Sequence, residues 1–277
     1  MLSLGFSPCP NDTFIFHGLV HGLTGSRCPS FADPVLADVE TLNTWAMRQA
    51  RLDVTKISFH ALGYVLDNYV LLRSGGALGR GCGPLLVARE ALAPQDLAGK
   101  SIAIPGRYTT AAMLMRIFSS ASYELVPMPF ETIMSAVARG KVDCGVIIHE
   151  GRFTYREQGL ICLRDLGDWW ERVTGHPIPL GGIVAKRSLG RDLLLRIEEC
   201  IRESVRLAFA DSRASRSFVK KHAQELDDQV VSSHINLYVN RFSEDLGGEG
   251  AAAVTEFLLR GRQAGMFPES AKEIFIT

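Results

Sequence analysis

Short apolar runs alternate with amphipathic stretches along the first sixty residues of the chain. Three runs have the length and composition of short strands: Leu2–Ser7, Val35–Glu40 and Leu52–Phe59. Two stretches between them carry apolar residues at helical spacing: Thr13–His21 and Thr41–Ala50. Between the first strand and the first helix, Pro8–Asp12 predicts a tight turn in which Asn11 or Asp12 caps the helix. This alternation predicts a mostly parallel sheet with helices on both faces.

The same pattern begins again near residue 101. The second set of predicted strands is Ser101–Ile104, Tyr123–Met128 and Val142–Ile148, and the helices between them are Thr110–Phe118 and Phe130–Arg139. Glu40, Arg48 and Asp53 in the first set match Glu131, Arg139 and Asp143 in the second, with equal Glu-to-Arg spacing and a difference of one residue before the Asp. Two similar units predict two similar lobes.

Two further apolar runs predict where the chain crosses between the lobes. Leu85–Ala88 precedes the second unit, and Leu180–Lys186 is a glycine-flanked strand that follows it. We therefore expect residues 1–87 and 184–277 to form the first lobe and residues 88–183 the second. Beyond Leu189 the spacing is mainly helical. The candidate helices are Arg191–Phe209, Ala214–His222, Asp227–Val239 and Glu249–Ala264.

Composition narrows the classes of protein and partner. Lys and Arg number 30, and Asp and Glu also number 30, so the net charge gives no reason to expect nucleic acid or an anionic membrane as a partner. No apolar run reaches the ~18 residues of a membrane span. The first residues lack the basic and apolar regions of a signal peptide, and the six cysteines lack the spacing of a zinc site. We expect a cytoplasmic protein with reduced thiols.

Polar residues follow the first strand of each predicted unit, where parallel sheets bind their ligands. Ser7 lies just before the first helix, and Thr109 and Thr110 lie at the start of the matching helix in the second unit. Helix starts offer free N–H groups and a partial positive charge, and hydroxyls add donors, which suits a carboxylate or phosphate. The alternative for Thr109 is a plain N-cap.

The third strands of the two units carry different functional groups at their ends. Lys56 and Ser58 share one face of the first, and a buried Lys needs a charged partner unless its ammonium reaches water along the surface. At the end of the equivalent strand the repeat places His149 opposite Phe59. His149 suits proton transfer near neutral pH, and Glu150 could orient it, whereas the other six histidines are interpreted as structural. The sequence offers neither a cluster of metal ligands nor a phosphate-binding loop.

Five segments of the chain resemble the 1,4-dihydroxy-6-naphthoate synthase family of the futalosine route to menaquinone. They are Ser7–Phe14 (SPCPNDTF), Asp53–Ser58 (DVTKIS), Gly79–Leu85 (GRGCGPL), Pro105–Ala111 (PGRYTTA) and His149–Tyr155 (HEGRFTY). The resemblance runs from the first strand to about Lys186. It implies an α/β fold like that of type 2 periplasmic binding proteins, with mixed, mostly parallel sheets, flanking helices and a cleft between two lobes.

The resemblance also implies a reaction and a set of residues. The family is a carbon–carbon lyase that converts cyclic dehypoxanthinylfutalosine, a small anionic aromatic substrate, to 1,4-dihydroxy-6-naphthoate without a metal or organic cofactor. Carried over by motif, His149 would be the proton acceptor. The substrate contacts would be Lys56, Ile57, Ser58, Thr109 and Thr110. Two alternatives on the same fold are a chorismate dehydratase-like enzyme of the same pathway and a non-enzymatic protein that binds a small anion.

Overall fold

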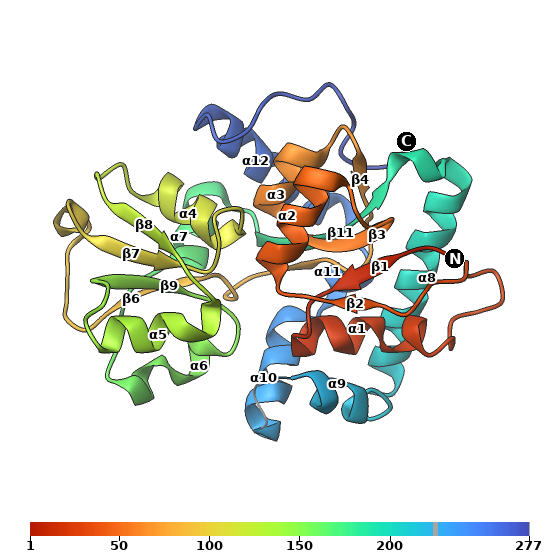
Figure 1. Ribbon diagram of the computed structural model, residues 1–277, viewed down its shortest axis with the longest axis horizontal. Helices are drawn as coiled ribbons and strands as arrows, with labels where there is room; N and C mark the ends of the chain where they lie inside the picture. Colours follow the sequence, from red (N-terminus) through yellow and green to blue (C-terminus); the bar gives the residue numbers. More distant parts are fainter. Residues whose placement is uncertain (224–226, 277) are drawn as a thin grey trace.

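The computed structural model describes residues 1–223 and 227–276, which form two lobes with one sheet each (Figure 1). The first lobe holds a six-stranded sheet and the second a five-stranded sheet. In each sheet a single strand, β11 (Ile178–Lys186) in the first and β6 (Leu85–Ala88) in the second, runs against all the others. The predicted α/β class with mixed, mostly parallel sheets is confirmed.

The first sheet has the strand order β2-β1-β3-β11-β4, with β5 also paired to β11. Its other strands are β1 (Leu4–Phe6), β2 (Val35–Leu36), β3 (Val54–Ser58), β4 (Tyr69–Leu71) and β5 (Ala77–Gly79). The helices that follow β1, β2 and β3 are α1 (Pro10–Val20), α2 (Val39–Gln49) and α3 (Phe59–Val65).

The second sheet has the order β10-β6-β9-β7-β8. Its other strands are β7 (Ser101–Ile104), β8 (Glu124–Pro127), β9 (Cys144–Ile147) and β10 (Ile161–Asp165). Its helices are α4 (Thr110–Phe118), α5 (Phe130–Ala138), α6 (Gly151–Thr154) and α7 (Leu166–Thr174).

The two sheets repeat one motif, as the sequence predicts. The order β2-β1-β3-β11 matches β8-β7-β9-β6, with the same relative strand directions. The Asp of each unit accepts hydrogen bonds at 2.8–2.9 Å from the backbone and hydroxyl of a Ser at the start of the unit: Asp53 from Ser3, and Asp143 from Ser101. This shared bracket joins the first and third strands of each unit.

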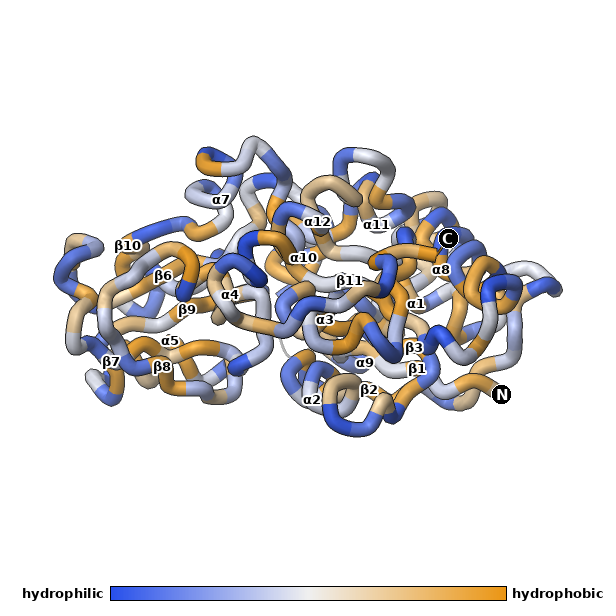
Figure 2. The backbone as a smooth tube through the Cα atoms, turned by 90° about the horizontal axis from the view of Figure 1, so that it is seen from above, coloured by the Kyte–Doolittle hydropathy of each residue, from blue (hydrophilic) through white to orange (hydrophobic). Residues whose placement is uncertain are grey.

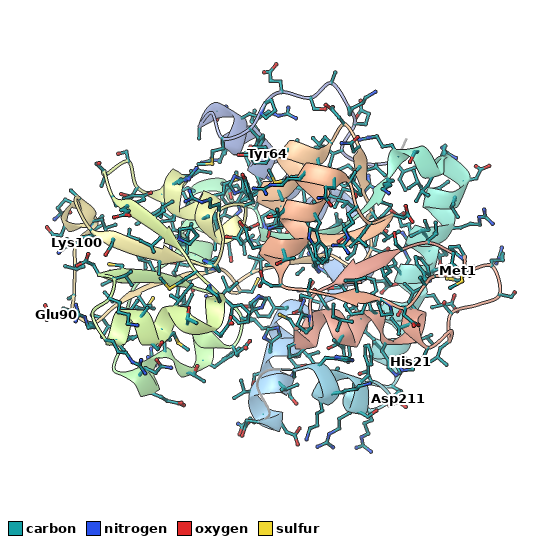
Figure 3. The ribbon with its side chains drawn as sticks, in the orientation of Figure 1. Met1, His21, Tyr64, Glu90, Lys100 and Asp211 are labelled. Carbon is teal, nitrogen blue, oxygen red and sulfur yellow. The ribbon has the colours of Figure 1, made fainter. Side chains whose placement is uncertain are left out.

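The repeat places the carboxyl ends of the strands at the boundary between the lobes. Met1, before β1, and Lys100, before β7, lie toward opposite outer ends of the molecule (Figure 3). The first and seventh strands therefore run from the two outer ends toward each other. Side chains that follow them in sequence meet at the lobe boundary, which is where parallel sheets bind ligands.

The chain crosses between the lobes just before two strands, β6 and β11, each of which belongs to one sheet along its whole length. β6 pairs along its whole length with strands of the second sheet, and β11 pairs with strands of the first from Ile178 to Lys186. The expected lobe boundaries at 87/88 and 183/184 lie inside these strands. Because a strand stays in one sheet, the sheets divide the chain just before Leu85 and just before Ile178.

Several predicted elements begin or end elsewhere. The predicted strand Val35–Glu40 ends at Leu36, because Asp38 caps α2 by accepting the Glu40 N–H at 2.8 Å. The first helix starts at Pro10, so Asn11 and Asp12 lie within its first turn instead of capping it. The predicted strand at 52–59 stops one residue short, where α3 begins.

The C-terminal third is helical as predicted and packs on the first lobe (Figure 1). Its helices are α8 (Arg191–Ala210), α9 (Arg216–His222), α10 (Asp228–Tyr238), α11 (Arg241–Glu244) and α12 (Gly247–Gln263). The short α11 is not among the predicted helices. The ends of the other four differ from the predicted ends by two residues at most. The predicted helical region also includes residues 224–226 and 277, which lie outside the described residues.

Hydrophobic stretches run through the strands at the centre of each lobe, and hydrophilic stretches lie mostly in loops and on outer helix faces (Figure 2). One core cluster spans both lobes and includes Phe59, Met113 and Trp170, which are fully buried. The lobes therefore share packed apolar surface beside the cleft. Among the described residues, no helix has the length and apolar composition needed to cross a membrane.

Gly83, in the crossing segment between β5 and β6, lies against the backbone of α7. A Cβ at Gly83 would lie 2.3 Å from the Cα of Gly167, and backbone cannot yield as a flexible side chain does. We expect Gly83→Ala to lower the free energy of unfolding by about 1–3 kcal/mol. Gly248→Ala is the matched control, since that Cβ meets nothing within 4 Å and lies in α12, where alanine is the better helix former. Urea unfolding that finds both variants equally stable would show that this backbone approach is not required.

Candidate active site

Two connected hollows lie between the lobes. An inner pocket of about 90 Å³ and an outer cleft of about 560 Å³ share three lining residues, Ser7, Val39 and His149. His149 follows β9 in the second lobe, whereas Ser7 and Val39 belong to the first. A molecule that fills both hollows would therefore pass beside the imidazole of His149.

The inner pocket brings together five of the six predicted site residues. Its lining includes Lys56, Ser58, Thr109, Thr110 and His149. Ile57, the sixth, is buried in the core cluster on the opposite side of β3, because successive residues of a strand face opposite ways. Only its backbone could take part in binding.

Lys56 forms a buried ion pair with Asp12. Its Nζ lies 2.9 Å from Asp12 Oδ1 and donates to the carbonyl of Gly75 at 3.1 Å, and both charged side chains are about 95% buried. The alternative in which this ammonium reaches water is wrong. An ammonium has three N–H donors, so the third remains available to a ligand in the inner pocket that Lys56 lines.

Ser58 is held as a hydroxyl donor. Asn43 accepts the Ser58 backbone N–H at 2.8 Å and donates from Nδ2 to Ser58 Oγ at 3.1 Å, which fixes the orientation of the Asn43 amide. Since Ser58 Oγ already accepts a hydrogen bond, its proton is free to point into the pocket. Asn43 lies on α2, and no pattern in the sequence indicates its contact with Ser58.

The two threonines use their hydroxyls within the protein. Thr109 caps α4, with Oγ1 accepting the Ala112 N–H at 3.2 Å and donating to the Gly106 carbonyl at 2.9 Å. Thr110 Oγ1 donates to the carbonyl of Leu180 at 2.7 Å. The donors that this turn can offer to an anion are therefore the backbone N–H groups of Thr110 and Ala111, which lie in the first turn and have no acceptor within the helix.

His149 has an unusual backbone and a neutral ring. Its φ of 56° is left-handed, a conformation that is uncommon for residues other than glycine and concentrates at functional sites. Its ring packs against Phe130, and its Nε2 lies 3.9 Å from Cys9 Sγ. Displacement of water from the ring, followed in size by the charge of His234, lowers the pKa of His149 to about 4. At neutral pH the imidazole is thus free to accept a proton.

His234 of α10 stacks on His149, although the sequence suggests only a structural role for it. The two rings are 5.5 Å apart and nearly parallel, at 8°. His234 Nε2 lies 2.9 Å from Asn11 Oδ1, and its Nδ1 lies 3.6 Å from Glu150 Oε2. No local signal reveals this contact, because His234 is 85 positions beyond His149 in the sequence.

The outer cleft is acidic. Its lining includes four carboxylates but one cationic side chain, Arg107; the carboxylates are Asp38, Glu40, Glu131 and Glu150. Partial burial raises the pKa of Asp38 and Glu40. Glu40 also joins the lobes, since its carboxylate accepts the backbone N–H of Tyr108 at 3.1 Å. Such a lining suits the hydroxyl groups of a neutral ligand better than a second anion.

One group of side chains has the spacing of a metal site. The ligand atoms of His149, Glu150 and His234 lie within 4.8 Å of one another. His234 has one ring nitrogen bonded to Asn11 and directs the other toward Glu150, so an ion would have to enter between His234 and Glu150.

Solved structures define the class of protein. The chain is similar to the alkanesulfonate-binding protein of Xanthomonas axonopodis, with 14% identity, a TM-score of 0.71 and coverage of 97% of this chain and 94% of that one. It is also similar to a crystal structure from Archaeoglobus fulgidus, with 33% identity, a TM-score of 0.89 and coverage of 96% and 98%. The fold is that of a periplasmic-binding-protein-like molecule with two lobes.

Sequence comparison identifies the family. Residues 2–263 match the family model described as menaquinone biosynthesis, and the chain belongs to this family. A curated relative from Thermus thermophilus, named 1,4-dihydroxy-6-naphthoate synthase, is 48% identical over 275 residues, which is 99% of each chain.

The buried ion pair generates a test of the site's framework. In Asp12→Asn the Lys56 ammonium stays buried opposite a neutral amide, so we expect the free energy of unfolding to fall by about 3–5 kcal/mol. Asp228→Asn is the control, because it makes the same change in the exposed pairs of Asp228 with Arg216 and Lys220 and should cost far less. Urea unfolding would contradict this account if the two variants lost equal stability.

Proposed function

We propose that the chain is a 1,4-dihydroxy-6-naphthoate synthase, a carbon–carbon lyase that releases 1,4-dihydroxy-6-naphthoate from cyclic dehypoxanthinylfutalosine. The observation that carries the proposal is the end-to-end similarity to a relative of that name, at 48% identity. The two hollows that meet at His149 suit a substrate with two chemically different ends.

The aromatic carboxylate end of the substrate binds in the inner pocket. Its carboxylate accepts hydrogen bonds from the hydroxyl of Ser58 and from the N–H groups of Thr110 and Ala111, where the partial positive charge of the α4 terminus adds to the attraction. Lys56 keeps its third N–H for charge that develops during the reaction, although Asp12 already balances most of the charge of Lys56.

The sugar-derived end of the substrate extends into the outer cleft. The hydroxyl groups of this part donate to the carboxylates there, and Glu40 is held at the lobe boundary to receive one. This orientation places the bond between the two ends beside His149, which lines both hollows.

His149 acts as the base. Cleavage of a carbon–carbon bond next to a carbonyl requires a group that takes a hydroxyl or carbon proton, and donors where enolate charge develops. The neutral imidazole of His149 meets the first need, and the third N–H of Lys56 meets the second. Formation of an aromatic product drives the reaction forward, and the closed lobes keep water from the intermediate.

The alternatives fit the cleft less well. Chorismate carries two carboxylates, and the second would meet the acidic lining of the outer cleft, where like charges repel. A protein that only binds a small anion would need neither the strained backbone of His149 nor its contact with both hollows. Product formation separates all three functions.

The test is conversion of cyclic dehypoxanthinylfutalosine, followed by chromatography and mass spectrometry of the product. We expect the unaltered protein to form the naphthoate, and His149→Asn to lose turnover by about 10²-fold or more because it lacks a base. Asparagine tolerates left-handed backbone, so the affinity measured by calorimetry should stay within about tenfold, or ~1.4 kcal/mol. His222→Gln, on α9, is the control.

Two results would contradict the proposal. Binding of the substrate by the unaltered protein without any product would leave a binding protein. Full turnover by His149→Asn would remove His149 from the chemistry while leaving the synthase activity in place.

A further inference from the structure

Two buried polar atoms face each other across the lobe boundary. His234 Nδ1, from α10 of the first lobe, lies 3.6 Å from Glu150 Oε2, which follows β9 in the second lobe. Neither atom has a hydrogen-bond partner among the described residues, and the His234 side chain is 1% exposed. Buried polar groups are rarely left without partners, so this pair requires an explanation.

The hydrogen-bond network fixes a proton on Nε2 of His234. Asn11 Nδ2 donates to Asp12 Oδ1 at 2.8 Å, so the amide oxygen of Asn11 is the atom that faces His234 Nε2 at 2.9 Å. An oxygen acceptor requires Nε2 to carry a proton. A neutral ring would then direct the lone pair of Nδ1 at the Glu150 carboxylate, which is repulsive, whereas an imidazolium would direct an N–H at it.

His234 also touches the residue before Glu150. Its ring lies parallel to that of His149 at 5.5 Å, and His149 holds the left-handed φ of 56°. Strained backbone of this kind persists only where the surroundings hold it in place. The Glu150 side chain, held from the opposite lobe, restrains the turn that carries His149.

We propose that His234 is a positioning residue: as an imidazolium it pairs with Glu150 across the lobe boundary and holds the His149 ring at the junction of the two hollows. The inference rests on the proposed function in so far as His149 is the base. Because the pair joins the two lobes, it holds His149 in place only while the lobes meet at this boundary.

The pairing has a consequence for the proton affinity of His149. The cation of His234 lowers the pKa of His149, and the anion of Glu150 raises it. Other titratable or charged groups near these three residues include Cys9, Asp12, Lys56 and Tyr238, and Cys82 and Arg152 act on Tyr238 in turn. They are present in every variant below, so a comparison between variants isolates the pair.

The experiment follows the titration of the His149 imidazole by NMR, with the resonance assigned by its loss in His149→Asn. His234→Gln removes the cation and should raise the pKa of His149 by about one unit, whereas Glu150→Gln removes the anion and should lower it by a similar amount. His222→Gln is the control and should leave it unchanged. A role in packing alone predicts shifts in the same direction, toward the ordinary value near 6.5, because both changes would open the site to water.

The kcat and KM of the same variants test the positioning role a second time. His234→Gln should lower kcat by about 10²-fold with little change in KM, as expected when a base is misplaced by about 1 Å. Glu150→Gln should have a similar effect, and the double variant should lose no more than either single variant, since both act through one contact.

Three results would overturn the proposal: shifts of the same sign in the two variants, no shift in either, or a stoichiometric metal ion in the purified protein that is lost in His234→Gln. If His234→Gln does not fold, the test rests on Glu150→Gln. A lowered pKa of His149 in that variant supports the proposal, and a raised pKa contradicts it. The NMR result does not depend on turnover, so failure of the proposed function and failure of this inference are distinguishable.

Discussion

The buried ion pair between Lys56 and Asp12 is the interaction on which the site depends. Removing two charges from water costs several kcal/mol per ion, and the cost is offset only when each charge has good partners. Asp12 meets this condition with Lys56, with both donors of Ser7 and with the amide of Asn11. The start of α1 is thereby fixed against β3, and the inner pocket lies beside this junction.

The effect of this pair extends to the other lobe. Because Asp12 orients Asn11, and the Asn11 oxygen accepts from His234, a carboxylate on α1 fixes a proton on Nε2 of a histidine on α10. His234 in turn faces Glu150 and stacks on His149 in the second lobe. An unbroken series of contacts therefore joins the buried charge of one lobe to His149 in the other. The arrangement around His149 therefore depends on both lobes and not on either lobe alone.

The duplicated unit explains the shape of the site but not its chemistry. Each unit joins its first and third strands with the same Ser–Asp bracket. The residues beyond that bracket have diverged, since Lys56 in the first lobe corresponds to Val146 in the second, and Phe59 corresponds to His149. One lobe supplies charge and hydroxyl donors, and the other supplies the imidazole of His149. A symmetric fold has thus become an asymmetric cleft.

Local patterns predict most of the strands and helices and the place of the site, because the residues at the ends of parallel strands meet at one edge. They do not reveal the partner of Lys56, which depends on how α1 packs against β3. They also miss His234, whose contact with His149 depends on the fold of the C-terminal helices. Thr109 and Thr110 were predicted as hydroxyl donors. Their hydroxyls bond backbone carbonyls instead, a choice that depends on the path of the neighbouring loops.

The central claim is that the carboxylate end of the ligand lies in the inner pocket with the reacting bond beside His149. A crystal structure with 1,4-dihydroxy-6-naphthoate bound tests it most directly. The account predicts the carboxylate at about 2.7–3.2 Å from Ser58 Oγ and the N–H groups of Thr110 and Ala111, with the dihydroxylated ring facing His149. A naphthoate bound with its carboxylate in the outer cleft, away from Ser58, would contradict it.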